Sequence, residues 1–309
     1  MEDTELRETL FNSLNEQGFI FQEKCAEVIN QSATTGWHLH TTEHPVSLKD
    51  KDIRIDVIIR DETLSQSSLF GVIECKRVDP RYSCWLFGKP LYDVPVPANA
   101  QIIKMSPSNR AAVNILRDEM RFVPIRAHFN VHAFYIDNWW VEVNIQEDRP
   151  PNKRLSNPEP LERVFIQVCR GVGGLVTEQK RQRTKTLRDL DEDDTDEFED
   201  LTSETYFVPI VITTAPLYVA SYDLSDVGIV NGTLGRNSIN FMGSPLSPEP
   251  VRWVMIDYGA AASVTPDELY YNFHGVDPVD LEPYNRRSIF VVNSDYINDF
   301  LTNLHLSDQ

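Results

Sequence analysis

Two strand-like segments joined by a short polar connection constrain the fold of this chain more than any other feature. The first, DIRIDVIIR at 52–60, carries an apolar residue at every second position. The second, LFGVIECKR at 69–77, is apolar until its last residues. Two strands separated by a short polar loop are most simply an antiparallel hairpin, which we expect here. The alternation predicts that one face of the first strand holds Ile53, Ile55, Val57 and Ile59 and that the other holds Arg54, Asp56 and Ile58.

The second strand ends in an unusual pair of charges. In GVIECKRVDP, at 71–80, strand geometry turns Glu74 and Lys76 to one face and Cys75 to the other. Charged groups at the end of a buried strand are costly unless they are paired or bound to something. Asp56 lies on the neighbouring strand of the expected hairpin, so two carboxylates can share one hard divalent cation. The main-chain carbonyl of Cys75 can supply a third oxygen ligand.

Two carboxylates and a lysine within one hairpin suffice for the hydrolysis of a phosphodiester. Bound Mg²⁺ or Mn²⁺ activates water and neutralises charge on a phosphate oxygen. A lysine beside the metal orients the nucleophile or stabilises the transition state. A structural alternative stays open, in which Asp56 is a surface residue and Glu74 and Lys76 form an ion pair, because the D/E-x-K pattern often occurs by chance.

The order of elements around these residues resembles that of the PD-(D/E)xK nuclease superfamily, which has the restriction-endonuclease-like fold. A helix expected at 19–32 precedes the strands, and the last of them ends in IECK. The resemblance covers residues 19–77 and extends to a helix at 161–177 and a strand at 206–213. One departure is that Ile55 stands where the motif normally has proline. The resemblance implies an α/β fold, with a central mixed β-sheet flanked by helices and a large insertion.

The resemblance also implies an activity and its residues. It implies an endonuclease that hydrolyses nucleic-acid phosphodiester bonds, of DNA rather than RNA, with a role in bacterial restriction or antiviral defence. Asp56, Glu74 and the Cys75 carbonyl would bind Mg²⁺ or Mn²⁺, and Lys76 would position or activate the water.

Two further positions follow from the same resemblance. Family members often carry an acidic residue on the first core helix, for which Glu23 is the candidate here and Glu27 the other choice. Some members carry a glutamine on a later helix, for which Gln167 is the candidate, with Gln101 as the alternative.

We expect one elaborated domain. The segment 180–204 places five basic side chains before ten acidic ones with few apolar residues, which predicts a mobile surface loop. GVGGLV, at 171–176, is expected as a helix end rather than a dinucleotide loop, and SNRAAVNILRDEM, at 108–120, as a helix. The expected parts are a core at 19–77 and 158–222, an insertion at 78–157, the charged loop at 180–204, and C-terminal strands and a helix at 250–309.

The net charge of −18 weighs against a protein that wraps nucleic acid unaided, because phosphate contacts require cations. It leaves room for a local basic groove, a bound metal or a basic partner subunit. Two other functions therefore stay open. The chain is alternatively a non-catalytic scaffold subunit of a larger complex, or a repair nuclease that recognises DNA structure.

The location expected for this chain is the cytoplasm. The start, MEDTELRETLF, has no basic segment followed by an apolar one, so we expect no signal peptide. No apolar run approaches the roughly 20 residues that a membrane helix needs. Four cysteines are scattered without a CxxC pair, which is typical of a reducing compartment.

Overall fold

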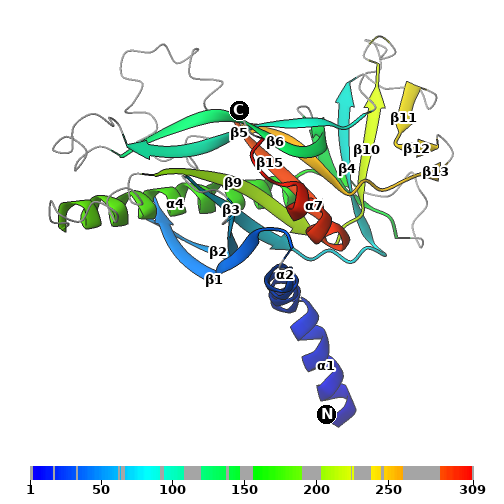
Figure 1. Cartoon of the computed structure of the whole chain (residues 1–309). Coiled ribbons are helices and arrows are strands. Elements are labelled where there is room, and N and C mark those ends of the chain that lie inside the picture. Colours follow the sequence, from blue (N-terminus) through cyan, green and yellow to red (C-terminus); the bar gives the residue numbers. More distant parts are fainter. Residues whose placement is uncertain are drawn as a thin grey trace.

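The computed structural model is a mixed α/β structure in which strands predominate. Its helices are α1 (Asp3–Glu16), α2 (Phe19–Gln31), α4 (Glu159–Asp189), the 3₁₀ helix η6 (Ser294–Tyr296) and α7 (Ile297–Asn303). The described residues are 3–16, 18–32, 34–61, 63, 67–90, 94–107, 120–136, 139–146, 156–189, 203–223, 225, 238–244, 247–259 and 286–307. Figure 1 shows α1 extending away from the rest of these residues.

Eight strands form the main sheet, in the order β1-β2-β3-β9-β15-β14-β6-β5. An additional pairing of β5 with β9 joins β9, β15, β14, β6 and β5 into a closed ring of strands. The strands of the main sheet are β1 (Trp37–Leu48), β2 (Lys51–Asp61), β3 (Ser67–Lys76), β5 (Val96–Pro107), β6 (Met120–Ile136), β9 (Glu204–Thr213), β14 (Trp253–Gly259) and β15 (Arg286–Asn293).

A second sheet has five strands in the order β11-β10-β4-β7-β8, and β12 pairs with β13 alone. The segment expected as an insertion, 78–157, thus supplies strands to both large sheets, including β5 and β6 of the main one. The remaining strands are β4 (Ser83–Pro90), β7 (Trp139–Asn144), β8 (Ser156–Asn157), β10 (Leu217–Tyr222), β11 (Ile239–Phe241), β12 (Gly243–Ser244) and β13 (Ser247–Pro248).

The expected hairpin is present, because β2 pairs antiparallel with β3. β1 pairs antiparallel with the other edge of β2, and β9 returns parallel to β3 after α4. Helices cover both faces of this part of the sheet, as expected. On one face α4 packs in a core with Ile55 and Val72, and on the other α2 and α7 pack in a core with Ile73 and Ile210. Figure 1 shows α4 running beside β1, β3 and β9.

The predicted division of β2 into two faces is wrong in one respect. Ile55 packs in the core on the α4 side, whereas Val57 and Ile59 pack in the core on the α2 side. The change of face coincides with Glu43, which lies between the β1–β2 pairs on either side of Asp56 and has a φ of 51°. A residue in this left-handed region breaks the regular alternation of a strand.

Helix α4 is longer than expected, and this corrects two predictions. Residues 180–189 continue the helix instead of beginning a loop, and residues 190–202 lie outside the described part of the chain. GVGGLV lies inside α4 rather than at its end. Its glycines allow close packing, because a Cβ on Gly171 would lie 3.1 Å from Ile55 Cγ1 and one on Gly174 would lie 2.5 Å from Val46 Cγ2.

One other expectation has no counterpart among the described residues. Residues 108–119 of the helix predicted at 108–120 lie outside them, and its last residue, Met120, begins strand β6 instead. The predicted C-terminal strands and helix correspond to β14, β15 and α7. In the part of the chain that the structure describes, no helix combines the length and the apolar composition of a membrane span.

Candidate functional site

The strands β2 and β3 separate at Asp56. They pair from Asp61–Leu69 to Val57–Ile73, and the pairing ends there. Beyond that point β3 stays paired with β9 as far as Lys76–Thr213. Asp56 Oδ2 accepts a hydrogen bond of 2.8 Å from the backbone N–H of Cys75. A side chain thus takes the place of the next ladder bond, and the Asp56 carboxyl is held beside the end of β3.

Glu74 is the buried acid of this site. Its exposed fraction is 8%, and its carboxyl forms no hydrogen bond or ion pair with any described residue. Burial, followed by the charge of Asp56, raises the pKa of Glu74 to about 9, against the lowering effect of Lys76. A buried carboxyl next to a second one either keeps its proton or requires a cation.

Asp56 shares this environment. Burial raises the pKa of Asp56 to about 6, the Cys75 N–H opposes the rise, and the charge of Glu43 adds to it. Two carboxyls held together in a poorly solvated place offer oxygen donors, which suit a small hard cation such as Mg²⁺ or Mn²⁺. The chemistry of the donor set therefore fits the metal that the sequence suggests.

The alternation expected at the end of β3 is observed. The side chain of Cys75 packs in the core on the α2 side, next to Cys25. The interaction with the Cys25 thiol, together with burial, raises the pKa of the Cys75 thiol. The Cys75 side chain thus lies on the α2 side of the sheet, and a metal beside Asp56 would use the backbone carbonyl of Cys75 rather than its thiol. Lys76 is half-buried and close enough to Glu74 to lower the pKa of that acid.

A metal bound here would depend on main-chain and solvent oxygens as well as on side chains. Among the described residues, no group of three or more His, Cys, Asp or Glu side chains is arranged to hold a metal ion. Asp56 and Glu74 are two carboxyls, so the set reaches three protein ligands only with the Cys75 carbonyl. Mg²⁺ commonly keeps several waters, which makes a site with few protein ligands chemically reasonable.

Two residues that the sequence did not suggest support Asp56. Gln22 of α2 is 8% exposed, and its Nε2 donates to the backbone carbonyl of Asp56 at 3.0 Å and to Glu43 Oε1 at 2.5 Å. Glu43 of β1 also accepts a hydrogen bond of 2.9 Å from Arg54 Nη1. A polar residue beside the apolar stripe of α2 was the only available signal for Gln22, and the sequence holds none for the left-handed conformation of Glu43.

The two secondary candidates lie elsewhere. Glu23 follows Gln22 on α2 and is exposed, and Gln167 is exposed on α4. Within the described residues, neither forms a hydrogen bond with Asp56, Glu74 or Lys76. The residue of α2 that contacts the site is Gln22, through the Asp56 carbonyl, and not the expected Glu23. Gln101, the alternative to Gln167, lies on β5, and its backbone N–H donates to Ser288 Oγ at 2.7 Å.

Comparison with known proteins adds no assignment to this geometry. No family model, curated protein or solved structure matches the chain.

Proposed function

We propose that this protein is a nuclease that uses Mg²⁺ or Mn²⁺ to hydrolyse phosphodiester bonds of nucleic acid. The observation that carries the proposal is the contact between Asp56 and the Cys75 N–H, which brings the carboxyls of Asp56 and Glu74 together next to Lys76. These are the groups that metal-dependent hydrolysis of a phosphodiester requires. DNA as substrate, and a role in restriction or antiviral defence, extend the proposal through the resemblance alone.

The topology supports the same proposal. The part of the main sheet that carries the site is built from elements in the chain order α2, β1, β2, β3, α4 and β9. The segment 78–157, which supplies other strands, lies between β3 and α4 in the chain. β1, β2 and β3 form an antiparallel meander, and β9 is parallel to β3. This is the arrangement that a restriction-endonuclease-like core implies. A fold by itself does not determine an activity, whereas the residues of the site determine which chemistry is possible.

Each residue has a definite role in the proposed reaction. Asp56, Glu74 and the Cys75 carbonyl would hold the cation, which supplies a water of lowered pKa and neutralises charge on the phosphate. Lys76 orients the attacking water and stabilises the negative charge that develops on the phosphate. Gln22 holds the backbone of Asp56, and the Cys75 N–H holds its side chain, so that the acid is oriented before substrate binds.

The test is a cleavage assay on duplex DNA, single-stranded DNA and RNA, with and without Mn²⁺. The wild type is compared with Asp56→Ala and Lys76→Ala, and Glu23→Ala is the matched control because it removes an exposed acid from the same region. We expect Mn²⁺-dependent cleavage by the wild type and by Glu23→Ala, and a loss of at least about a hundredfold in the other two.

Two results would contradict the proposal in different ways. Cleavage that survives both Asp56→Ala and Lys76→Ala would place the active site elsewhere. A wild-type protein that cleaves none of the three substrates would favour the non-catalytic scaffold.

A further inference from the structure

A cavity of about 540 Å³ lies directly beyond Lys76. It opens at the carboxyl ends of β3, β9 and β15, three neighbouring parallel strands in which Lys76 pairs with Thr213 and Thr213 with Asn293. The backbone N–H of Thr214, a lining residue, donates to the carbonyl of Lys76 at 3.4 Å. Ligands of α/β proteins commonly bind at the carboxyl ends of parallel strands. The lining of the cavity begins at Arg77, the residue that follows Lys76.

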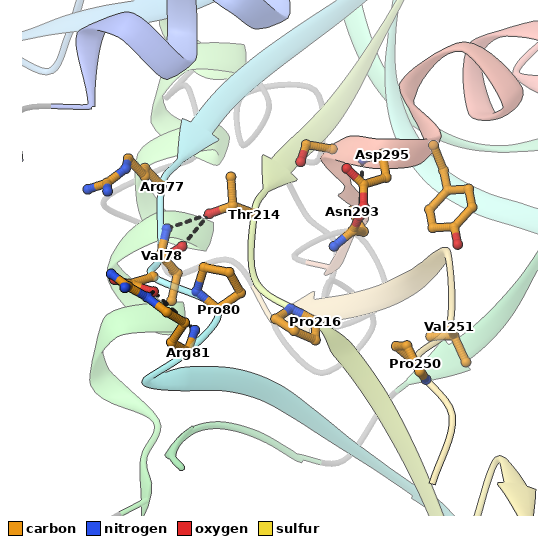
Figure 2. Close-up of a pocket in the computed structure, with 13 residues that line it drawn as sticks. Arg77, Val78, Pro80, Arg81, Thr214, Pro216, Pro250, Val251, Asn293 and Asp295 are labelled. Carbon is orange, nitrogen blue, oxygen red and sulfur yellow. Dashed lines mark hydrogen bonds and ion pairs between the residues drawn. The ribbon is translucent and has the colours of Figure 1, made fainter. Parts of the chain in front are cut away.

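Hydrogen bonds hold the walls of this cavity in place. Val78 N–H donates to Thr214 Oγ1 at 2.7 Å, and Thr214 Oγ1 donates to the carbonyl of Val78 at 2.5 Å. On the opposite wall, Asn293 Nδ2 donates to the carbonyl of Ala215 at 3.0 Å. Figure 2 shows Val78, Pro80 and Arg81 on one side, Asn293, Asp295 and Val251 on the other, and Thr214 and Pro216 between them. The cavity is thus preformed.

The lining combines apolar walls with charged side chains of both signs, Arg77, Arg81, Asp79 and Asp295. Prolines and Tyr296 contribute the apolar surface, and Arg252 lies over the Tyr296 ring at 5.1 Å from its centroid. Arg81 is paired with Asp79 at 2.7 Å. Arg77 is exposed and forms no ion pair within the described residues. A cavity of this size suits a small planar ligand, and a neighbouring arginine suits a phosphate.

We propose that this cavity receives one unpaired nucleotide of the substrate, next to the phosphate that is cleaved, with its base against Tyr296 and the prolines and its phosphate at Arg77. The inference rests on the proposed nuclease function and narrows its substrate class. A base in a regular duplex is stacked and paired, and it cannot enter a cavity without leaving the helix. The substrate is therefore a single strand, or a duplex with an unpaired nucleotide at the site of cleavage.

The test uses equilibrium binding in a Lys76→Ala background, so that it does not depend on catalysis. The probes are labelled DNA oligonucleotides: a single strand, its full duplex, and the duplex with one unpaired nucleotide. Ser294→Trp fills the cavity with a bulky side chain, and Asn298→Trp, on the exposed surface of α7 outside the lining, is the matched control.

We expect the control to bind the single strand at least tenfold more tightly than the full duplex, with the unpaired-nucleotide duplex also bound. Ser294→Trp should lose about tenfold or more of the single-strand affinity, the scale of one stacked base. Arg77→Ala, a surface substitution that keeps the fold, should lower the slope of log affinity against log salt by about 0.7.

The outcomes separate this inference from the proposed function. Equal single-strand affinity in Ser294→Trp and Asn298→Trp, with an unchanged salt slope in Arg77→Ala, overturns the cavity assignment and leaves Mn²⁺-dependent cleavage of a duplex intact. Binding of single strands that Ser294→Trp abolishes, without cleavage by the wild type, supports the cavity and contradicts the nuclease. Absence of binding by every probe contradicts the cavity assignment as well.

Discussion

Asp56 on β2 accepts a hydrogen bond of 2.8 Å from the backbone N–H of Cys75 on β3, at the point where these strands stop pairing. The Asp56 carboxyl here accepts a hydrogen bond that a backbone carbonyl of a paired strand would otherwise accept. The contact satisfies a donor at the end of β3 and fixes the carboxyl of Asp56 beside Glu74. The separation of two strands is thus coupled to the assembly of the candidate site.

Replacement of Gln22 tests the support behind Asp56. In Gln22→Ala, the Asp56 carbonyl loses a donor at 3.0 Å and Glu43 loses its contact with α2. We expect a loss of about 1–3 kcal/mol in the free energy of unfolding, because a partly buried acceptor is left unsatisfied. Urea denaturation measures this loss, and cleavage should fall because Asp56 is less well oriented.

Glu23→Ala is the control on the same helix. Glu23 is exposed, so its removal should change the free energy of unfolding by less than about 0.5 kcal/mol. Equal effects of the two substitutions would mean that Gln22 does not support the site.

The pH dependence of stability tests the environment of Glu74 in the absence of metal. The pKa of Glu74 is about 9 in the folded protein, above its ordinary value of 4.5, so the folded state binds this proton more tightly than the unfolded state. The stabilisation is fully present below pH 4.5 and is lost as the pH rises through 9, with a slope of at most about 1.4 kcal/mol per pH unit.

Denaturation by urea at a series of pH values, with a chelator present, measures this slope. Glu74→Gln removes the titrating group. Between pH 6 and pH 9, the free energy of unfolding should therefore fall less steeply with pH in this variant, by the contribution of about one bound proton. A wild-type curve that rises with pH over this interval, or one that Glu74→Gln leaves unchanged, would contradict the burial of a protonated Glu74.

Packing of α4 on the main sheet predicts different outcomes for two glycines of this helix. A Cβ on Gly174 would lie 2.5 Å from Cγ2 and 2.9 Å from Cβ of Val46, so Gly174→Ala should destabilise the protein by about 1–3 kcal/mol. A Cβ on Gly171 meets its nearest atom at 3.1 Å. An alanine at position 171 would be mildly crowded, but it would gain about 1 kcal/mol in helix propensity. Gly171→Ala should therefore leave the free energy of unfolding nearly unchanged. Thermal denaturation of the two variants checks the difference, and equal melting temperatures would refute it.

The half of the fold that carries the site could be predicted because its patterns are local. The apolar period of 2 in β2, the stripe with Cys25 and Ile29 on α2, and the alternation of Glu74, Cys75 and Lys76 each depend on nearby residues only. The same alternation led to a wrong assignment of Val57, because the face changes at Asp56, opposite the left-handed Glu43 of the neighbouring strand.

The rest of the arrangement depends on long-range contacts that no local pattern records. Gln22 reaches Asp56 across 34 positions, and β5 and β6 join the main sheet through pairings with β9 and β14. The basic stretch that ends α4 was mistaken for a loop because its many charges and few apolar residues outweighed its helix-forming lysines and arginines. Tertiary context decided each of these cases.

Binding of Mn²⁺ is the direct test of whether Asp56 and Glu74 hold a divalent cation, because this measurement needs no knowledge of the substrate. Electron paramagnetic resonance of free Mn²⁺ during a titration measures the bound fraction for the wild type, Asp56→Asn, Glu74→Gln and Glu23→Gln. Saturable binding by the wild type and Glu23→Gln that is lost in Asp56→Asn and Glu74→Gln is the predicted result. Binding by Glu74→Gln as tight as that of the wild type, or no saturable binding by the wild type, would contradict the claim.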